Sequence, residues 1–209
     1  SDLGQSKKNN LFDEIEKLEI LREQADYDTG SISKSSSWCL YCIVKYFEPK
    51  NIMEIGTFIG KSSWSMMKAQ DDSGLIKSYF VTCDMSNDIS IPWAGKSVLK
   101  QYKKQKSNFM IKNETISPDL VFIDGRISNE ELLEFGNLIN ENTIIVLDDF
   151  EGAEKGVVNL FNLRKLSKLK SHFLIYPCDR KKLEEINEFS YAPMAIMLPA
   201  KMIELVPQG

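Results

Sequence analysis

The sequence of 209 residues contains a single histidine, His172, and only four cysteines. A structural zinc site in a protein usually takes four Cys or His ligands, arranged as two closely spaced pairs. Here only Cys39 and Cys42 form such a pair, while Cys83 and Cys178 stand alone in the sequence. This shortage of nitrogen and sulfur ligands argues against a zinc site.

The Cys39–Cys42 pair is also a poor match for a redox motif. Redox pairs usually stand where a strand enters a helix, whereas this pair lies inside the segment SSSWCLYCIVKYF. At helical spacing the two cysteines share one face with Trp38, Ile43 and Tyr46. We therefore expect both thiols to be reduced, buried and dispensable for activity, and to pack as small apolar side chains.

Long apolar runs and an excess of positive charge are absent as well. No run approaches the roughly 20 residues that a membrane-spanning helix needs. The first ten residues, SDLGQSKKNN, are polar and lack the apolar core of a signal peptide. The net charge of −4 does not favour a nucleic-acid surface. We expect a cytoplasmic protein with a small-molecule partner and with no nucleic-acid or membrane partner, and we leave a homodimer open.

The sequence is rich in short apolar runs that alternate with helical patterns. The expected strands are 50–56, 77–85, 108–113, 119–125, 142–150, 171–177 and 191–202. The expected helices are 10–25, 35–47, 61–70, 93–106, 128–140 and 153–170. Continuous apolar runs are typical of strands covered on both faces, as in a mostly parallel sheet. We expect one domain over residues 1–209, with N-terminal helices (1–48) before a doubly wound α/β core (49–209).

Polar residues follow each of the first five expected strands. In order along the chain they are Glu54 with Gly56 and Gly60, then Asp84, Asn113 with Glu114, Asp124, and Asp148 with Asp149. Ligands of open α/β sheets bind beyond the carboxyl ends of the strands. Acidic residues at so many strand ends indicate that this edge of the sheet binds a ligand. They do so better than the alternative, in which the polar residues only mark where each strand leaves the core.

The chemistry of the first two strand ends narrows the ligand. Asp84 offers two acceptor oxygens, which suit the paired hydroxyls of a ribose. The loop from Gly56 to Gly60, followed by a helix N-terminus, suits a carboxylate or a phosphate. Phe58 takes the place of the second glycine of a dinucleotide loop, and Glu54 would repel a diphosphate but attract an ammonium. Ribose, ammonium and carboxylate together indicate S-adenosylmethionine rather than NAD.

Three segments resemble the motifs of class I S-adenosylmethionine-dependent methyltransferases. MEIGTFIGKSSWSM resembles the first motif, DLVFIDGR the fourth-strand motif and TIIVLDDFEGAEKGV the fifth-strand motif. The resemblance covers about residues 35–165 and is to the metal-dependent O-methyltransferases of the catechol, caffeoyl-CoA and macrolide-sugar type. It implies a Rossmann-like sheet, mostly parallel with an antiparallel last strand, and O-methylation of a small molecule.

The resemblance also implies roles for individual residues. The methionine portion of the cofactor would be lined by Glu54, Gly56, Thr57, Gly60 and Ser62. Asp84 would hold the ribose, and the adenine would lie near Asn113 and Glu114. Asp124, which would also touch the cofactor, would bind a divalent cation together with Asp148 and Asp149. Carboxylate oxygens suit Mg²⁺. The chain from Asp124 onward reads DGRIS, which offers Arg126 and Ile127 and no general base other than the aspartates themselves, so Asp124 and Asp149 are the candidate catalytic groups.

Two other functions remain open at this point. One is a protein that binds S-adenosylmethionine or a nucleotide without transferring a methyl group, and the other is an NAD-dependent oxidoreductase. The metal assignment has its own alternative. A basic side chain lying between the aspartates, with Arg126 as the first candidate, would make this cluster an ion pair instead of a metal site.

Overall fold

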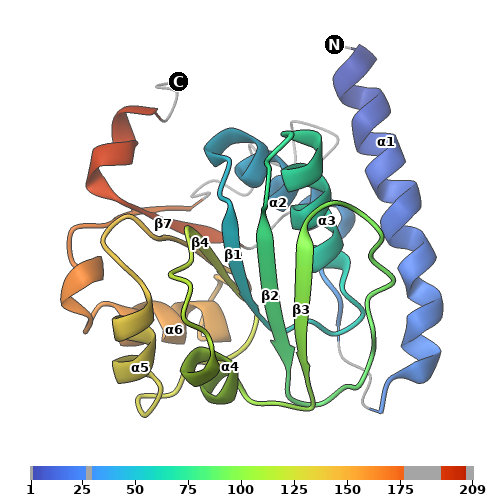
Figure 1. Ribbon diagram of the computed structural model, residues 1–209. Helices are drawn as coiled ribbons and strands as arrows, with labels where there is room; N and C mark the ends of the chain where they lie inside the picture. The colour runs from blue at the N-terminus through green and yellow to red at the C-terminus, as the bar shows by residue number, and fades with distance from the viewer. Residues whose placement is uncertain (1, 27–29, 177–193, 206–209) are drawn as a thin grey trace.

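The computed structural model describes residues 2–26, 30–176 and 194–205. Within them a seven-stranded sheet has the order β3-β2-β1-β4-β5-β7-β6 (Figure 1). The strands are β1 (Asn51–Ile55), β2 (Tyr79–Asp84), β3 (Val98–Lys103), β4 (Leu120–Ile123), β5 (Ile144–Leu147), β6 (Phe173–Ile175) and β7 (Ala195–Leu198). The first five run parallel, and β7 is antiparallel to both β5 and β6. This confirms the expected mostly parallel sheet with an antiparallel last strand.

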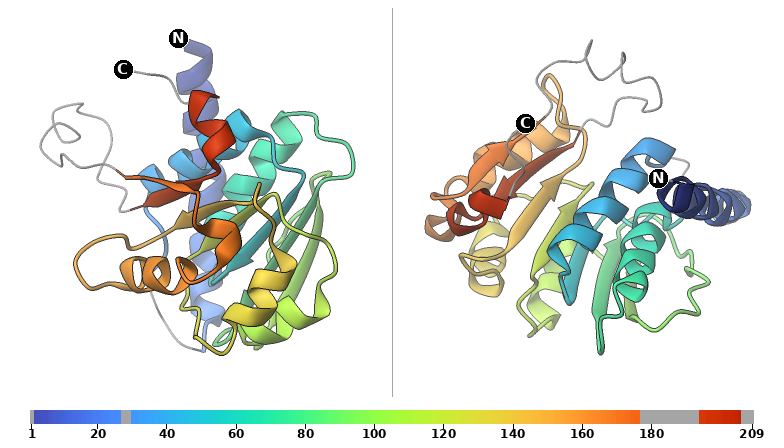
Figure 2. Two further views of the ribbon diagram at one scale, coloured as in Figure 1. Left: turned by 90° about the vertical axis from the view of Figure 1, so that its left-hand side faces the viewer. Right: turned by 90° about the horizontal axis from the view of Figure 1, so that it is seen from above.

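Helices cover both faces of the sheet (Figure 2). One face carries α1 (Asp2–Glu16), α2 (Lys34–Phe47) and α3 (Lys61–Asp72), and the 3₁₀ helix η1 (Lys17–Gln24) continues α1. The other face carries α4 (Ser107–Asn113), α5 (Leu132–Leu138) and α6 (Lys155–Leu163). Two short 3₁₀ helices, η2 (Ser167–Leu169) and η3 (Ala200–Leu205), complete the described elements.

The central strands are buried on both faces, as their continuous apolar sequences predict. Ile52 of β1 packs into the cluster beneath α2 and α3, while its neighbour Met53 packs into the cluster beneath α4, α5 and α6. Side chains of a strand alternate between the faces of the sheet, so two apolar cores require apolar residues at consecutive positions. The register aligns Glu54 of β1 with Thr82 of β2 and with Phe122 of β4.

Two expected elements are wrong. Residues 98–103 form strand β3 where a helix was expected, and residues 107–113 form helix α4 where a strand was expected. β3 is an edge strand, so its sequence VLKQYK mixes exposed and half-buried side chains and lacks a continuous apolar run. Met110 and Ile111 of α4 are buried side by side, which gives a short helix the apolar appearance of a strand.

The expectation for the cysteines is correct in part. Cys39 and Cys42 are free thiols, but Cys39 is half-buried and Cys42 is exposed. Helix α2 turns a different face to the core, with Leu40 and Val44 fully enclosed. The Tyr41 hydroxyl fixes this orientation, since it donates a 2.7 Å hydrogen bond to Asp72 at the end of α3.

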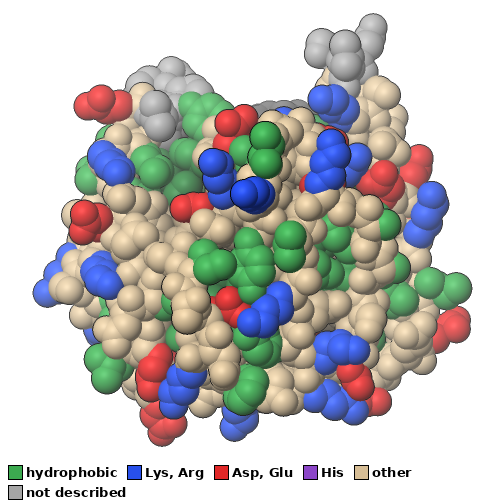
Figure 3. Space-filling view, in the orientation of Figure 1, with side chains coloured by type: hydrophobic (Ala, Val, Ile, Leu, Met, Phe, Trp, Pro, Cys, Tyr) green, Lys and Arg blue, Asp and Glu red, His purple; other side chains and the backbone are tan. Residues whose placement is uncertain are grey.

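Acidic and basic side chains are interspersed over the face shown in Figure 3, with apolar side chains between them. In the part of the chain that the structure describes, no helix has both the length and the apolar sequence needed to cross a membrane.

Candidate functional site

The loop between β1 and α3 is shaped by two glycines with positive φ. Gly56 has φ +102° and Gly60 has φ +81°, a region that residues with a Cβ rarely adopt. A Cβ on Gly56 would lie 3.2 Å from the carbonyl carbon of Asp124, and one on Gly60 would lie 2.6 Å from the side chain of Ile91. Both glycines therefore serve the protein's own packing, whatever else lies against the loop.

Glu54, at the end of β1, is completely enclosed by protein. Its carboxylate accepts hydrogen bonds from the hydroxyls of Ser62 (2.5 Å), Thr82 (2.7 Å) and Ser63. Burial raises the pKa of Glu54 to about 7, although the three hydroxyl donors lower it in part. Glu54 thus fastens the first turn of α3 to β1 and β2, which corrects the expected contact between this carboxylate and a ligand.

Asp84 ends β2 and faces the same loop. Its carboxylate accepts hydrogen bonds from the backbone N–H groups of Phe58 (2.7 Å), Ser86 (2.8 Å) and Asn87 (2.8 Å). Phe58 has φ 45°, an uncommon conformation for a residue with a side chain. The half-buried Asp84 therefore holds the loop after β1 and the loop after β2 together, at the place expected for a ribose-binding acid.

A cavity of about 460 Å³ lies next to Asp84, over the carboxyl ends of β1, β2 and β4. It is lined by Ile55, Gly56, Cys83, Met85, Gln105, Lys106, Ser107, Asn108, Gly125, Arg126, Ser128, Glu130 and Glu131. The buried Glu131 joins two of its walls, because its carboxylate accepts from the backbone N–H of Ser128 (2.7 Å) and from the hydroxyl of Ser107. Hydrogen bonds of the folded protein therefore hold two walls of the cavity together at the strand ends.

A narrow crevice on the other side of the loop gathers several of the predicted residues. Its lining is Gly30, Ser31, Ile32, Thr57, Phe58, Ile59, Gly60, Lys61, Ser62 and Asp124. Thr57, Gly60, Ser62 and Asp124, to which the resemblance gave contacts with one ligand, thus meet at one place. Gly56 lines the larger cavity instead, so the loop from Gly56 to Gly60 separates the two spaces.

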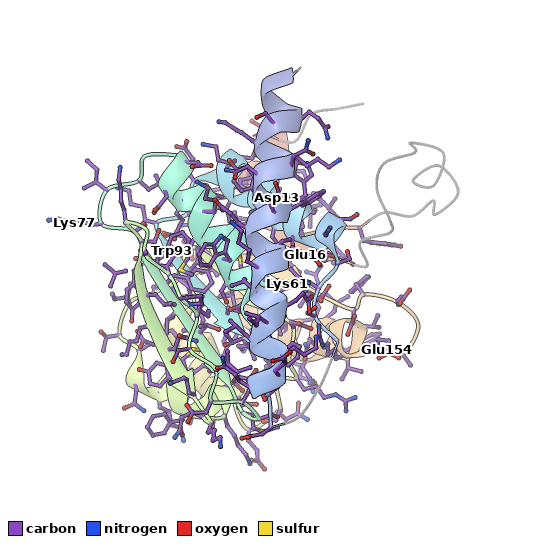
Figure 4. All side chains as sticks on the ribbon, turned by 90° about the vertical axis from the view of Figure 1, so that its right-hand side faces the viewer. Asp13, Glu16, Lys61, Lys77, Trp93 and Glu154 are labelled. Carbon is purple, nitrogen blue, oxygen red and sulfur yellow. The ribbon has the colours of Figure 1, made fainter. Side chains whose placement is uncertain are left out.

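The N-terminal helical segment covers the outer side of this loop. The guanidinium of Arg22, in η1, lies 5.1 Å from the centre of the Phe58 ring. Glu19 of the same 3₁₀ helix pairs with Arg22 (3.0 Å) and with Lys61, the first residue of α3. In Figure 4 the label of Lys61 lies over the N-terminal helical segment, in agreement with the ion pair between Lys61 and Glu19.

Asn113 and Glu114, expected near an adenine, lie elsewhere. Glu114 accepts hydrogen bonds from Tyr79 (3.0 Å), Lys100 (2.6 Å) and Tyr102 (2.7 Å). Tyr79 is the first residue of β2, so this cluster stands towards the amino end of that strand, opposite the cavity. The error follows from taking residues 108–113 as a strand, which moved the expected strand end from Lys103 to Asn113.

The three aspartates after β4 and β5 do come together, but around a lysine. The ammonium of Lys155 lies 2.6 Å from Asp124 Oδ1 and 3.1 Å from Asp149 Oδ2. Burial and then the charges of Asp124 and Asp149 raise the pKa of Asp148 to about 8. Burial also raises the pKa of Asp124, against the opposing effect of Lys155. The cluster therefore contains its own positive charge.

This arrangement does not fit the expected divalent cation. Among the described residues, no group of three or more Asp, Glu, His or Cys side chains is arranged to hold a metal ion. One carboxylate oxygen of Asp124 and one of Asp149 are engaged by the ammonium of Lys155. The alternative reading of the cluster, an ion pair, is the one the geometry supports, with Lys155 in place of the suspected Arg126. Arg126 is exposed and lines the cavity.

Comparison with known proteins supports the fold. No protein-family model matches the sequence, and no curated protein sequence does either. Among solved structures, the O-methyltransferase TomG from Streptomyces achromogenes, in complex with SAM, superposes with a TM-score of 0.58 at 16% identity, with 88% of each chain covered. An O-methyltransferase from Bacillus cereus in complex with SAH has a TM-score of 0.54 at 16% identity, with 90% of each chain covered. A putative caffeoyl-CoA O-methyltransferase from Staphylococcus aureus has a TM-score of 0.52 at 14% identity, covering 92% of this chain and 99% of its own. The chain therefore has the Rossmann-like fold of these methyltransferases.

Several residues of the site were missed by reading the sequence. The lining contributed by Gln105 and its neighbours follows β3, and it was hidden by the wrong assignment of that strand. Lys155 stands inside the quoted fifth-strand motif, four residues before Asn159. That spacing places both on one face of a helix and could have indicated their shared contacts with the chain after β4.

Proposed function

We propose that this protein transfers a methyl group from S-adenosylmethionine to a hydroxyl group of a small molecule. The observation that carries the proposal is the cavity of about 460 Å³ at the carboxyl ends of β1, β2 and β4, lined by Gly56 of the glycine loop and by Cys83 and Met85, the two chain neighbours of Asp84. Open α/β sheets bind their ligands at this edge. Fold neighbours solved with SAM or SAH add support at the level of the fold.

In this proposal the adenosine occupies the large cavity. The ribose hydroxyls would donate to Asp84, sharing its carboxylate with the backbone N–H groups that it already accepts. The adenine would lie between Met85, which is 64% exposed, and the chain around Ser107. Asn113 and Glu114 have no part in this arrangement, because Glu114 is bonded to Tyr79 at the other end of β2.

The methionine portion would follow the loop from Gly56 towards the crevice that contains Thr57, Gly60 and Asp124. The methyl group would then point to the region of Asp124 and Asp149. During transfer the acceptor oxygen would form a bond to the methyl carbon while the carbon–sulfur bond breaks and its electron pair stays on sulfur. The hydroxyl proton would pass to a carboxylate, for which Asp149, with a side chain 40% exposed, is the most accessible of the three aspartates.

Binding of the cofactor is tested by isothermal titration with S-adenosylmethionine, S-adenosylhomocysteine and NAD. We expect both adenosyl ligands to bind and NAD not to bind. Asp84→Ala should weaken adenosyl binding, while Asp88→Ala serves as the matched control, because Asp88 is exposed and pairs with Lys103 (3.1 Å). Binding of NAD alone would instead support the oxidoreductase alternative.

Transfer itself needs a separate experiment, because a protein that only binds the cofactor would pass the titration. The purified protein is incubated with methyl-labelled S-adenosylmethionine and a panel of hydroxylated small molecules. Label recovered in a product supports the transferase, whereas binding without any labelled product supports the binding protein. The cytoplasmic location and the homodimer remain predictions that neither experiment addresses.

A further inference from the structure

The residue that occupies the centre of the aspartate cluster is the first residue of α6. Lys155 reaches Asp124 of the chain after β4 and Asp149 of the chain after β5, so its ammonium bridges two strand ends. Its side chain is 27% exposed, against 19% for Asp124 and 40% for Asp149. The positive charge is thus half-buried among carboxylates and not free in solvent.

The backbone of α6 fixes where this ammonium can lie. Gly156 approaches so closely that a Cβ on it would stand 2.1 Å from the carbonyl oxygen of Asp148. One helical turn later, Asn159 donates to the carbonyl of Gly125 (2.8 Å) and accepts from the N–H of Ile127 (3.0 Å). Helix α6 is therefore hydrogen-bonded directly to the chain that follows Asp124. These bonds fix the position of the Lys155 backbone, from which its side chain extends.

A divalent cation in this cluster would have to share the carboxylates of Asp124 and Asp149 with the ammonium of Lys155. Mg²⁺ binds carboxylate oxygens at about 2.0 to 2.1 Å and requires near-octahedral geometry. The Lys155 ammonium already stands within 2.6 Å of Asp124 and 3.1 Å of Asp149. An ammonium at this point would repel an incoming cation and would neutralise part of the negative charge that attracts it.

We propose that the ammonium of Lys155 takes the place of the divalent cation at the end of β4 and β5, so that this site works without a metal ion. The part of the proposal that concerns catalysis rests on the proposed methyltransferase function. The part that concerns ion occupancy does not, because it follows from the geometry of Lys155, Asp124 and Asp149 alone. In the transferase, the same ammonium would supply the positive charge that faces the acceptor oxygen.

Ion occupancy is tested with Mn²⁺ as the probe, by measuring the fraction of bound ion from its electron paramagnetic resonance signal. The variants are Lys155→Met, which keeps most of the side-chain length without the charge, and Lys155→Gln as a second neutral replacement. The matched control is Lys112→Met, because Lys112 on α4 pairs with Glu134 of α5 (3.4 Å) and not with the aspartates. Circular dichroism checks that each variant is folded.

We expect no saturable Mn²⁺ binding by the wild-type protein or by Lys112→Met. Either Lys155 variant should gain saturable binding, with an affinity at least tenfold above that of the wild type, and adding Asp124→Asn should remove the gain. Wild-type binding as tight as that of the variants would overturn the proposal, since the ion would then displace Lys155. Failure of both folded variants to bind would also overturn it, because the aspartates would then form no cation site.

The closing measurement separates this proposal from the proposed function. Titration of the wild-type protein with S-adenosylmethionine in EDTA reports on the cofactor site alone. Loss of cofactor binding together with the expected Mn²⁺ results would refute the methyltransferase and leave the role of Lys155 in the cluster intact. Cofactor binding together with tight Mn²⁺ binding by the wild type would refute the proposed role of Lys155 and leave the proposed methyltransferase intact.

Discussion

The backbone N–H of Phe58 donates a 2.7 Å hydrogen bond to the carboxylate of Asp84. Phe58 belongs to the loop after β1 and Asp84 ends β2, so this bond joins two neighbouring strand ends. It also compensates the cost of the left-handed conformation of Phe58, which is about 1 to 2 kcal/mol for a residue with a Cβ. The acid expected to recognise a ribose therefore also holds the loop in position.

Asp84→Ala is expected to weaken adenosyl binding and to lower stability together. Each charge-assisted hydrogen bond that is lost costs about 1.5 to 3 kcal/mol at most. Titration calorimetry gives the first effect and urea unfolding gives the second. Asp84→Asn keeps one acceptor oxygen, so it should retain part of the stability. Full adenosyl affinity in a folded Asp84→Ala protein would remove this residue from the proposed site.

Glu54 is expected to make stability fall as the pH rises from about 4.5, the ordinary pKa of a glutamate, to about 7. Burial raises the pKa of this carboxyl to about 7, so the folded protein binds the proton more tightly than the unfolded chain does. Its contribution to stability is therefore complete at low pH and is lost as the pH rises towards 7. The melting temperature of Glu54→Gln should depend less on pH in this interval than that of the wild type. Parallel curves for the two proteins would contradict the assignment.

The sequence predicts most of the sheet because buried parallel strands carry an obvious signal. β1, β2, β4 and β5 are largely apolar runs with an acid within the last two residues of the strand or directly after it, and the structure has a strand at each of them. β3 escaped because an edge strand with one open side tolerates polar residues such as Lys100 and Gln101. The short helix α4 carries the adjacent buried residues Met110 and Ile111, and it was mistaken for that strand.

The site was predictable where a residue's place in the chain fixes its place in space. Thr57, Gly60 and Asp124 meet because they follow neighbouring parallel strands. The enclosure of Glu54 was not predictable, since it depends on three hydroxyls from α3 and β2 turning towards it. The position of Lys155 between the aspartates depends on the packing of α6, and its one sequence signal is the four-residue spacing of Lys155 and Asn159, which lies within α6 and not around β5.

Cys39 and Cys42 are expected to be dispensable. Both are free thiols, and Cys42 is exposed, so Cys42→Ala should change the free energy of unfolding by no more than about 0.5 kcal/mol. Cys39→Ala removes a half-buried side chain that packs against the core beneath α2 and should cost more. Urea unfolding and titration with S-adenosylmethionine test the two effects. Lost cofactor binding in the folded double variant would show that the pair has a function.

Asn159→Ala is expected to be among the more destabilising single substitutions in α6. The side chain is fully buried, and its loss leaves the carbonyl of Gly125 and the N–H of Ile127 without this partner. An unsatisfied buried polar group costs about 1 to 3 kcal/mol. Asn162→Ala is the matched control, because Asn162 is half-buried and donates one bond of 3.1 Å to the carbonyl of Ile127. Equal unfolding free energies for the two variants would show that α6 does not depend on Asn159.

Glu131→Ala is expected to weaken adenosyl binding although this carboxylate is already bonded to the protein. It accepts from the N–H of Ser128 and the hydroxyl of Ser107, which line opposite parts of the large cavity. Without it the start of α4 and the chain after β4 are no longer fastened together, so cofactor binding must first order them.

The matched control for this change is Glu130→Ala, because Glu130 also lines the cavity but is exposed. We expect the affinity for S-adenosylhomocysteine to fall about tenfold in Glu131→Ala, to stay near the wild-type value in Glu130→Ala, and to recover in part in Glu131→Gln, whose amide oxygen can still accept one bond. A tenfold loss corresponds to about 1.4 kcal/mol, which is within the range of one hydrogen bond to a charged group. An equal loss in Glu130→Ala would mean that negative charge at the cavity, and not the fastening of its walls, controls binding.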